Sequence, residues 1–276
     1  MAISAKDVNA LRQATGAGMM DCKKALEEAN GDFDGAVEIL RKKGQKVSAK
    51  RADREASEGG VFVDTNADSS MGFILSLNCE TDFVAKNDAF VNLGNSLIKV
   101  ASDNSLGTVE DLLAANLDGK AVQDHLTDMM GKIGEKIEIA AYKVVKGEAV
   151  VPYIHSNSKL GVLVSLKGTG GKDVVAVGKD VAMQIAAMNP VGVSDSDVSE
   201  EVKEKELAFG REKAIQEGKP ENIVDKIAQG MLKKFMKDNT LLAQDFVKDG
   251  SKSVAQVLKD VNADLTVESF SRVSIG

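Results

Sequence analysis

Residues 69–77 read SSMGFILSL, an apolar run with one glycine that follows a pair of serines. A second run of the same type, SKLGVLVSL, occupies residues 158–166. Short apolar runs bounded by turn-forming residues are typical of buried strands. Each run follows a strand-like segment and precedes a helical pattern, so the repeat predicts two related strand-turn-strand-helix halves about a pseudo-two-fold axis. The alternative is chance, because apolar strands bounded by Ser and Gly are common.

The segments around the two runs indicate an α+β core. A hairpin is expected from residues 61–63 and 73–77 around a polar turn at 66–70. Further periodic segments predict helices at 86–102, 108–116, 120–132 and 254–261, and strands at 137–145, 150–155, 161–166 and 265–270. The last of these strands is expected to return to the sheet of the second half.

Upstream of the core, residues 4–44 indicate three short helices separated by glycine turns, the third ending at Gly44. Their few apolar residues can close only a small bundle, so we expect a marginal and separately mobile headpiece. The shared residues are Val8, Leu11, Leu26, Val37 and Leu40. Residues 41–54 are strongly basic, which is typical of a solvated tether and, as the sharper alternative, of a nucleic-acid contact.

A charged stretch after Pro190 predicts a helical hairpin at 196–236, with Pro220 opening its second helix. Such a hairpin could pair with another copy, brace a partner or be solvated. The predicted fold is therefore α+β, with an N-terminal three-helix domain like the ubiquitin-associated domain, a duplicated core with antiparallel sheets, and an inserted helical hairpin. The expected division is 1–45 for the three-helix domain, 46–58 for a basic linker, 59–140 for the first core half, 141–195 with 237–276 for the second, and 196–236 for the hairpin.

Composition excludes several classes of protein. The formal charge of -7 argues against a protein that coats nucleic acid, because phosphate neutralisation needs a surplus of Lys and Arg. The two cysteines, Cys22 and Cys79, lie in different predicted units, so we expect no disulfide framework and a cytoplasmic location. The N-terminal residues carry early charges and lack an apolar leader, and no apolar run is long enough for a membrane span.

Motifs for catalysis are also missing. The possible soft metal ligands, Cys22, Cys79, His125 and His155, lack metal-site spacing, and no nucleotide-binding loop or catalytic serine elbow occurs. We therefore expect a binding protein with no metal, no cofactor and no catalytic residue. Cys22 is most simply a buried small residue.

Two segments stand out as candidate contact surfaces. Residues 11–26, LRQATGAGMMDCKKAL, place Met19 and Met20 at the start of the second helix, where only one can enter so small a core. An exposed flexible methionine suits a partner contact, while the alternative is that both cover the core.

The second segment is residues 78–87, NCETDFVAKN, where the first hairpin leads into a helix. Loops at strand ends commonly present working residues. The alternative is structural: Thr81 or Asp82 caps the helix and Phe83 packs on the core.

Both segments resemble the elongation factor Ts family, which is recognised by an L-R-x-x-T-G-x-G-M-M-x-C-K-K-A-L stretch and a T-D-F-V-A-K segment. The resemblance runs over essentially the whole chain and implies a guanine-nucleotide exchange factor that binds elongation factor Tu, both GDP-bound and nucleotide-free, and promotes GDP release during translation elongation. It implies no enzyme activity, no cofactor, no direct nucleic acid and no membrane. A homodimer or a 2:2 complex with the partner stays open.

The resemblance also assigns roles to residues. The headpiece would dock on the nucleotide-binding domain of elongation factor Tu, and Asp82 and Phe83 would intrude near the magnesium and phosphate site. The second core half would touch a further domain. The implied partner-binding residues are Thr81, Asp82, Phe83, Val84, Met19, Met20, Lys23, Leu11 and His155.

The sequence leaves two rival functions open. The headpiece alone would suit a helical adaptor of the ubiquitin-associated type that binds a peptide or another protein. An enzyme with a site in the crevice between the core halves is the other, against which stands the missing cluster of convergent titratable groups.

Overall fold

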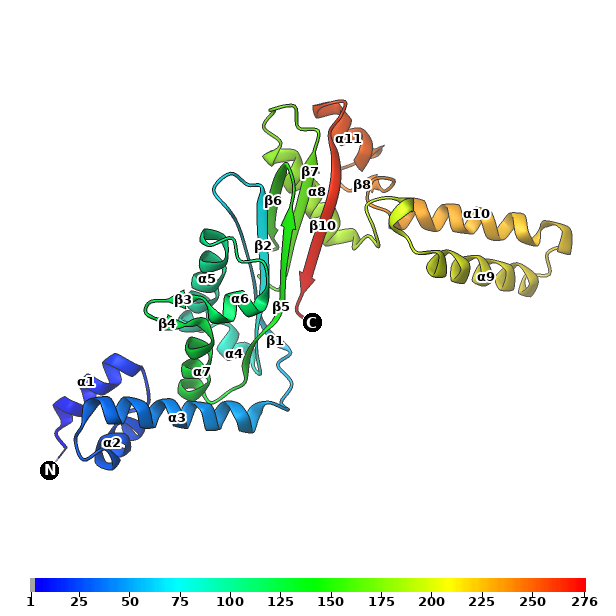
Figure 1. The fold of residues 1–276 in the computed structure, drawn as a ribbon. Coiled ribbons are helices and arrows are strands. Elements are labelled where there is room, and N and C mark those ends of the chain that lie inside the picture. Colours follow the sequence, from blue (N-terminus) through cyan, green and yellow to red (C-terminus); the bar gives the residue numbers. More distant parts are fainter. Residues whose placement is uncertain (1–2) are drawn as a thin grey trace.

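The computed structural model describes residues 3–276 and has the α+β architecture expected from the sequence (Figure 1). Three helices form the headpiece: α1 (Ala5–Thr15), α2 (Met19–Glu28) and α3 (Phe33–Arg51). The first two residues of the expected 1–45 unit lie outside the described residues. Ser4 caps α1 and forms a reciprocal capping box with Asp7, and Gly16 ends the helix in a left-handed conformation. The small core beneath contains Val8, Leu11, Cys22, Ala25, Leu26 and Ala36.

The third helix is longer than the sequence predicted. It continues through Gly44 to Arg51, so most of the expected basic tether is helical. Gly44 is buried where α3 crosses α7 (Val122–Ile133), and a Cβ on Gly131 of α7 would lie 2.8 Å from the Gly44 Cα. Arg41 adds an ion pair of 2.9 Å to Asp124 on the same helix. The headpiece is therefore packed on the core through α3, and its expected separate mobility stays a prediction.

The first half of the core is a three-stranded antiparallel sheet covered by helices. Its strand order is β1-β2-β5, with β1 at Glu58–Thr65, β2 at Met71–Cys79 and β5 at Ile137–Lys146. Between β2 and β5 the chain forms α4 (Asp82–Ala85), α5 (Asp88–Asp103), α6 (Val109–Ala114), the short strands β3 (Asn116–Leu117) and β4 (Lys120–Ala121), and α7. β5 pairs with β2 on both sides of a register shift between Ile139 and Ala141, so the expected boundary between residues 140 and 141 falls inside one strand. The remaining domain division stays a prediction.

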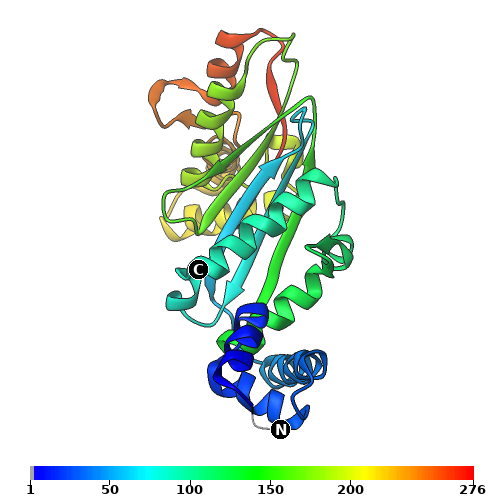
Figure 2. The same ribbon diagram turned by 90° about the vertical axis from the view of Figure 1, so that its left-hand side faces the viewer.

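The second half repeats this plan. Its sheet has the order β10-β7-β6, built from β6 (Ala149–Ile154), β7 (Leu160–Lys167) and β10 (Thr266–Ser274), which confirms the predicted return of the last strand. The remaining elements are α8 (Val175–Met188), the 3-10 turn η1 (Asp195–Asp197), β8 (Asp245–Phe246), β9 (Asp249–Ser253) and α11 (Val254–Val261). Figure 2 shows the two halves stacked along the length of the molecule, with the headpiece at one end.

Reciprocal contacts join the halves at equivalent positions. The Val61 N–H donates to the Ser158 carbonyl at 2.7 Å, and the Val150 N–H donates to the Ser69 carbonyl at 2.7 Å. Ser69 and Ser158 both adopt a positive φ, of 58° and 55°. The two apolar runs that form β2 and β7 thus occupy the same place in each half, as the predicted pseudo-two-fold arrangement requires.

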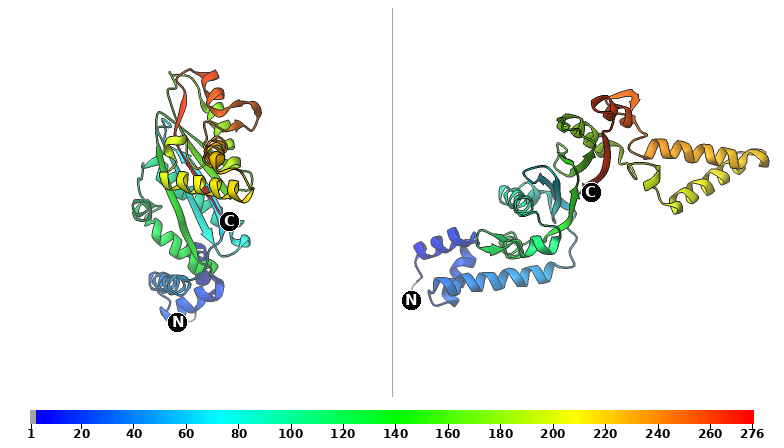
Figure 3. Two further views of the ribbon diagram at one scale, coloured as in Figure 1. Left: turned by 90° about the vertical axis from the view of Figure 1, so that its right-hand side faces the viewer. Right: turned by 45° about the horizontal axis from the view of Figure 1, so that its top comes forward.

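The helical hairpin consists of α9 (Glu200–Gln216) and α10 (Glu221–Asn239), and it projects from the core (Figures 1 and 3). The two helices approach closely where Gly210 meets Ala228, since a Cβ on Gly210 would lie 2.9 Å from the Ala228 Cα. Pro220 lies immediately before α10, as predicted. No helix within residues 3–276 is long and apolar enough to cross a membrane.

Candidate functional site

The loop that follows β2 presents an aromatic ring to solvent. Thr81 is the N-cap of α4, and its hydroxyl accepts a hydrogen bond from the Val84 N–H at 3.4 Å. Val84 turns inward and is buried, whereas the Phe83 side chain is 83% exposed. The capping role considered for Thr81 is confirmed, but the alternative that Phe83 packs on the core is wrong. We call residues 81–83 the T-D-F loop.

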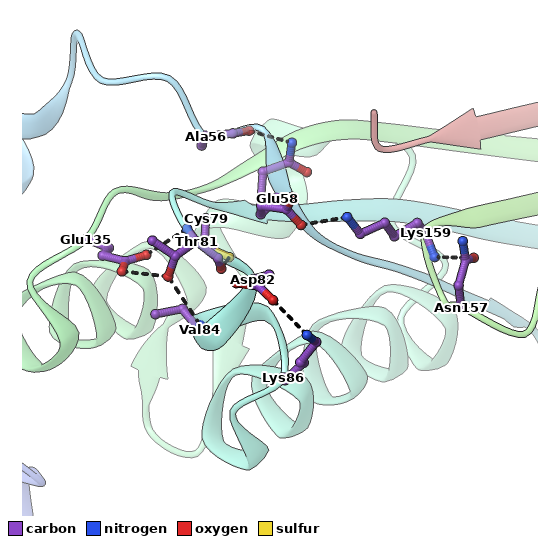
Figure 4. Close-up of polar contacts among 11 residues, drawn as sticks. Ala56, Glu58, Cys79, Thr81, Asp82, Val84, Lys86, Glu135, Asn157 and Lys159 are labelled. Carbon is purple, nitrogen blue, oxygen red and sulfur yellow. Dashed lines mark hydrogen bonds and ion pairs between the residues drawn. The ribbon is translucent and has the colours of Figure 1, made fainter.

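Asp82, the second residue of this loop, belongs to a group of four charged side chains that also contains Lys86, Lys159 and Glu58 (Figure 4). Its Oδ2 accepts a hydrogen bond of 2.7 Å from the Lys86 Nζ. That bond, assisted by the charges of Lys86 and Lys159, holds the pKa of Asp82 below its ordinary value. Lys159 in turn pairs with Glu58 at 2.6 Å. Asp82 therefore stays ionised and is oriented by a cation that is itself exposed.

Cys79, two residues before the T-D-F loop, is inert in this environment. Its thiol is buried and donates to the Thr81 carbonyl at 3.2 Å. Burial, with a smaller contribution from the charge of Glu135, raises the pKa of Cys79 to about 12. Cys79 thus supports the loop from beneath and is not a nucleophile at neutral pH.

On the headpiece, the two methionines lie outside the core. Met19 is 56% exposed and Met20 is 64% exposed, so the expectation that one of them enters the core is wrong. The core is already filled from α1, α2 and α3, and from the first turn of α2 the residue that enters it is Cys22, not Met19 or Met20. Lys23 on the same helix is exposed and pairs with Glu27 at 3.8 Å.

Two of the candidate residues are buried. Leu11 has no exposed surface, because it lies in the headpiece core. Val84 of α4 is 9% exposed and packs into the core of the first half. Neither offers surface for direct contact in this conformation. They hold the exposed residues of α2 and α4 in place.

His155 lies in the exposed turn between β6 and β7, and its Nδ1 is 3.0 Å from the Tyr153 hydroxyl. The hydrogen bond from Val61 to Ser158 holds this turn against β1. Figure 4 shows Lys159 of the same turn next to Glu58 and close to Asp82. The structure therefore brings the His155 turn and the T-D-F loop together, and it packs the headpiece on the half of the core that carries this loop.

Sequence reasoning missed several residues at the site. Lys86 and Glu80 lie inside the segment 78–87, but the sequence does not predict their contacts. Lys159 and Glu135 lie far from it in the chain and carry no local signal. Only the sheet register and the end of α7 place them beside the T-D-F loop.

Comparison with known proteins gives a consistent result. The model of the family described as elongation factor TS matches residues 80–276. Over 276 residues, the full length of both chains, the sequence is 53% identical to elongation factor Ts of Amoebophilus asiaticus. It is also 53% identical over 274 residues to elongation factor Ts of Cytophaga hutchinsonii, covering 99% of each chain. Against elongation factor Ts of Clostridium perfringens the identity is 46% over 282 residues, covering 99% of this chain and 93% of the relative.

Proposed function

The chain belongs to the elongation factor Ts family, and from this premise we propose that its T-D-F loop is the part that drives nucleotide exchange on elongation factor Tu. Elongation factor Ts is the nucleotide exchange factor for elongation factor Tu, an activity that rests on protein-protein binding and not on catalysis by the chain itself. The open question is which residues act on the partner and how.

The observation that carries the proposal is the exposure of Phe83. A large aromatic ring that is 83% exposed on a soluble protein is costly to keep in water, and such rings are typical anchors of protein interfaces. An anchor buried in a partner pocket is worth about 2 to 4 kcal/mol. If the pocket exists only in the nucleotide-free partner, that energy favours the nucleotide-free state.

Linkage then accounts for GDP release. A protein that binds the nucleotide-free partner more tightly than the GDP-bound partner must weaken GDP by the same factor by which GDP weakens it. Asp82 adds a negative charge on the same short helix. Placed near the phosphates and magnesium of the partner, this carboxylate repels the phosphates and competes for the cation, so Phe83 and Asp82 act in the same direction.

In this proposal the headpiece supplies binding affinity for the partner. Met19 and Met20 offer exposed, flexible apolar surface on α2, and Lys23 places a cation on the same helix. His155 adds a contact beside the T-D-F loop. These groups bind the partner in both nucleotide states and so set affinity, while the loop sets the rate of release.

The assembly state belongs to the same proposal. A homodimer, or a 2:2 complex with elongation factor Tu, would use the projecting α9–α10 hairpin, because this element extends away from the core (Figure 3). Sedimentation of the protein alone and with its partner, with and without the hairpin tip, measures that contribution.

The test uses elongation factor Tu loaded with fluorescent GDP and chased with excess unlabelled GDP. We expect a variant carrying Asp82→Ala and Phe83→Ala to release GDP tens to hundreds of times more slowly than the parent, from the anchor energy above. The matched control is Phe33→Ala, which removes an exposed ring at the start of α3 and should leave the rate unchanged. A folded double variant that releases GDP at the parental rate would overturn the proposal.

A further inference from the structure

The base of the T-D-F loop is closed by a reciprocal contact with the turn between α7 and β5. Glu135 accepts two hydrogen bonds from Thr81, one from its N–H at 3.1 Å and one from its hydroxyl at 2.8 Å (Figure 4). In return, the N–H of the next residue, Lys136, donates to the Glu80 carboxylate at 2.7 Å. Glu80 and Thr81, at the start of the T-D-F loop, are thus bound to two consecutive residues of the turn, Glu135 and Lys136. We call these four residues the clasp.

The clasp also meets the last turn of α3. Arg51 donates to the Glu80 carboxylate at 2.6 Å, and Arg54 approaches it at 3.9 Å. The Glu80 side chain is only 14% exposed, so this ion pair is largely removed from water. A shielded, hydrogen-bonded pair specifies geometry more strongly than an exposed one. The headpiece helix therefore ends at the loop that carries Phe83.

A helix as short as α4 cannot orient Phe83 unaided. It has four residues, about one turn, and an isolated turn is unstable because nucleation costs more than its few hydrogen bonds return. The Thr81 hydroxyl, which accepts from the Val84 N–H at the start of α4, donates its own proton to Glu135. Glu135 consequently sets the direction of the cap as well as the position of the loop.

Gly134 explains why Glu135 faces the loop. It ends α7 with φ at 80°, a left-handed conformation that glycine adopts without strain, and this turn reverses the chain. The carboxylate that follows is half-buried, and its two hydrogen bonds within residues 3–276 both come from Thr81. Because both hydrogen bonds that the Glu135 carboxylate accepts come from Thr81, a change at Glu135 affects the loop through Thr81.

We propose that Glu135, together with Glu80, is a positioning residue of nucleotide exchange, and that the clasp holds α4 with Phe83 directed outward before elongation factor Tu binds. This inference rests on the function proposed for the T-D-F loop. Neither carboxylate touches the partner. Glu135 acts through Thr81, and Glu80 acts through its bonds to the Lys136 N–H and to Arg51. An anchor that is already ordered loses less freedom on binding than a mobile one.

The experiment measures GDP release at increasing concentrations of the factor, which separates the maximal rate from the half-saturating concentration. We expect Glu135→Ala to lower the maximal rate about five- to thirty-fold, the effect of losing one or two hydrogen bonds to a charged group. The half-saturating concentration should change by less than about two-fold, because the exposed face of α2 is untouched. Glu135→Gln keeps one acceptor oxygen and should restore part of the rate. The matched control is Glu110→Ala, which removes an exposed carboxylate from the first turn of α6.

A double-mutant cycle with Phe83 identifies the route of the effect. If Glu135 acts by positioning the ring, Glu135→Ala should cost almost nothing in a Phe83→Ala background. If Glu135 served folding alone, Glu135→Ala would lower the melting temperature and leave the maximal rate unchanged. If its effect on the rate were independent of the ring, the losses of rate from Glu135→Ala and Phe83→Ala would add fully. Either result overturns the positioning role.

The same variants distinguish failure of the function proposed for the T-D-F loop from failure of the role proposed for the clasp. A parental rate for Phe83→Ala would remove the function proposed for the loop itself. If the Phe83→Ala variant releases GDP slowly and the Glu135→Ala variant releases it at the parental rate, the function proposed for the loop stands and the role proposed for the clasp is overturned. If Glu135→Ala does not fold, Glu135→Gln and Thr81→Val test the same contact from its two sides, and parental rates for both would overturn the proposal.

Discussion

The crossing of α3 and α7 provides a sharp test of how the headpiece is held. Gly44 of α3 and Gly131 of α7 meet with so little space that a Cβ on Gly131 would lie 2.8 Å from the Gly44 Cα. Because the obstructing atom belongs to the backbone, no change of rotamer can relieve the overlap. Gly131→Ala should therefore either separate the two helices or distort them.

The chain offers a matched control for this substitution. Gly230 also lies inside a helix, α10, but a Cβ there would meet nothing within 4 Å. Alanine at either position gains about 0.5 to 1 kcal/mol from helix propensity and from the lower entropy of the unfolded chain. Gly230→Ala should therefore stabilise the protein, and the propensity gain cancels when the two variants are compared.

What remains in the comparison is the cost of overpacking. Forcing a methyl group into a packed contact typically costs about 1 to 3 kcal/mol. We expect the free energy of unfolding of Gly131→Ala to be lower than that of Gly230→Ala by this amount, as measured by urea denaturation followed by circular dichroism. Hydrogen exchange should in addition show faster exchange of the α3 amides in Gly131→Ala alone, since these amides lose the protection of the crossing.

The outcome that would refute the reasoning is specific. Equal unfolding free energies for the two alanine variants, with equal protection of α3, would mean that the helices are not in contact at these glycines. The headpiece would then be attached through its C-terminal turn alone.

Two further predictions concern the site. Burial opposes ionisation of Glu80, but hydrogen bonds from Lys136 and Arg51 and the charges of Arg51 and Arg54 outweigh it and hold the pKa of Glu80 below 4.5. The stabilisation from Glu80 is therefore complete above pH 4.5 and is lost as the pH falls through the lower pKa of the folded state, so Glu80→Gln should flatten the decline of the urea midpoint below about pH 4.5. For the headpiece, replacing Met19 and Met20 with alanine should raise the half-saturating concentration in the exchange assay and leave the maximal rate unchanged, while the unfolding free energy changes by less than about 0.5 kcal/mol because both side chains are exposed. A lower maximal rate at an unchanged half-saturating concentration would contradict the proposal that the headpiece sets affinity and the T-D-F loop sets the rate of GDP release.

Much of this protein follows from local sequence pattern. Alternating and helical periods place β1, β2, β5, β6, β7 and α5, α6, α7 and α11 close to their observed bounds, whereas α8 (Val175–Met188) received no predicted bounds. The two runs at 69–77 and 158–166 predict the duplicated core. The place of the T-D-F segment after a strand marks it as a candidate contact loop, but its role on the partner is implied by the family resemblance and stays a prediction. These inferences succeed because period, caps and turn residues act over a few residues and are therefore visible in the chain itself.

Tertiary structure alone decided how the parts are joined. No local pattern shows that Gly44 marks a helix crossing instead of a helix end, that Leu11 is buried while Met19 and Met20 are both exposed, or that Phe83 stands free of the core. Glu135 reaches Thr81 only because α7 ends at Gly134 next to the end of β2. Such contacts join segments that are distant in sequence, and they depend on how whole faces pack, which the periodicity of a single segment does not encode.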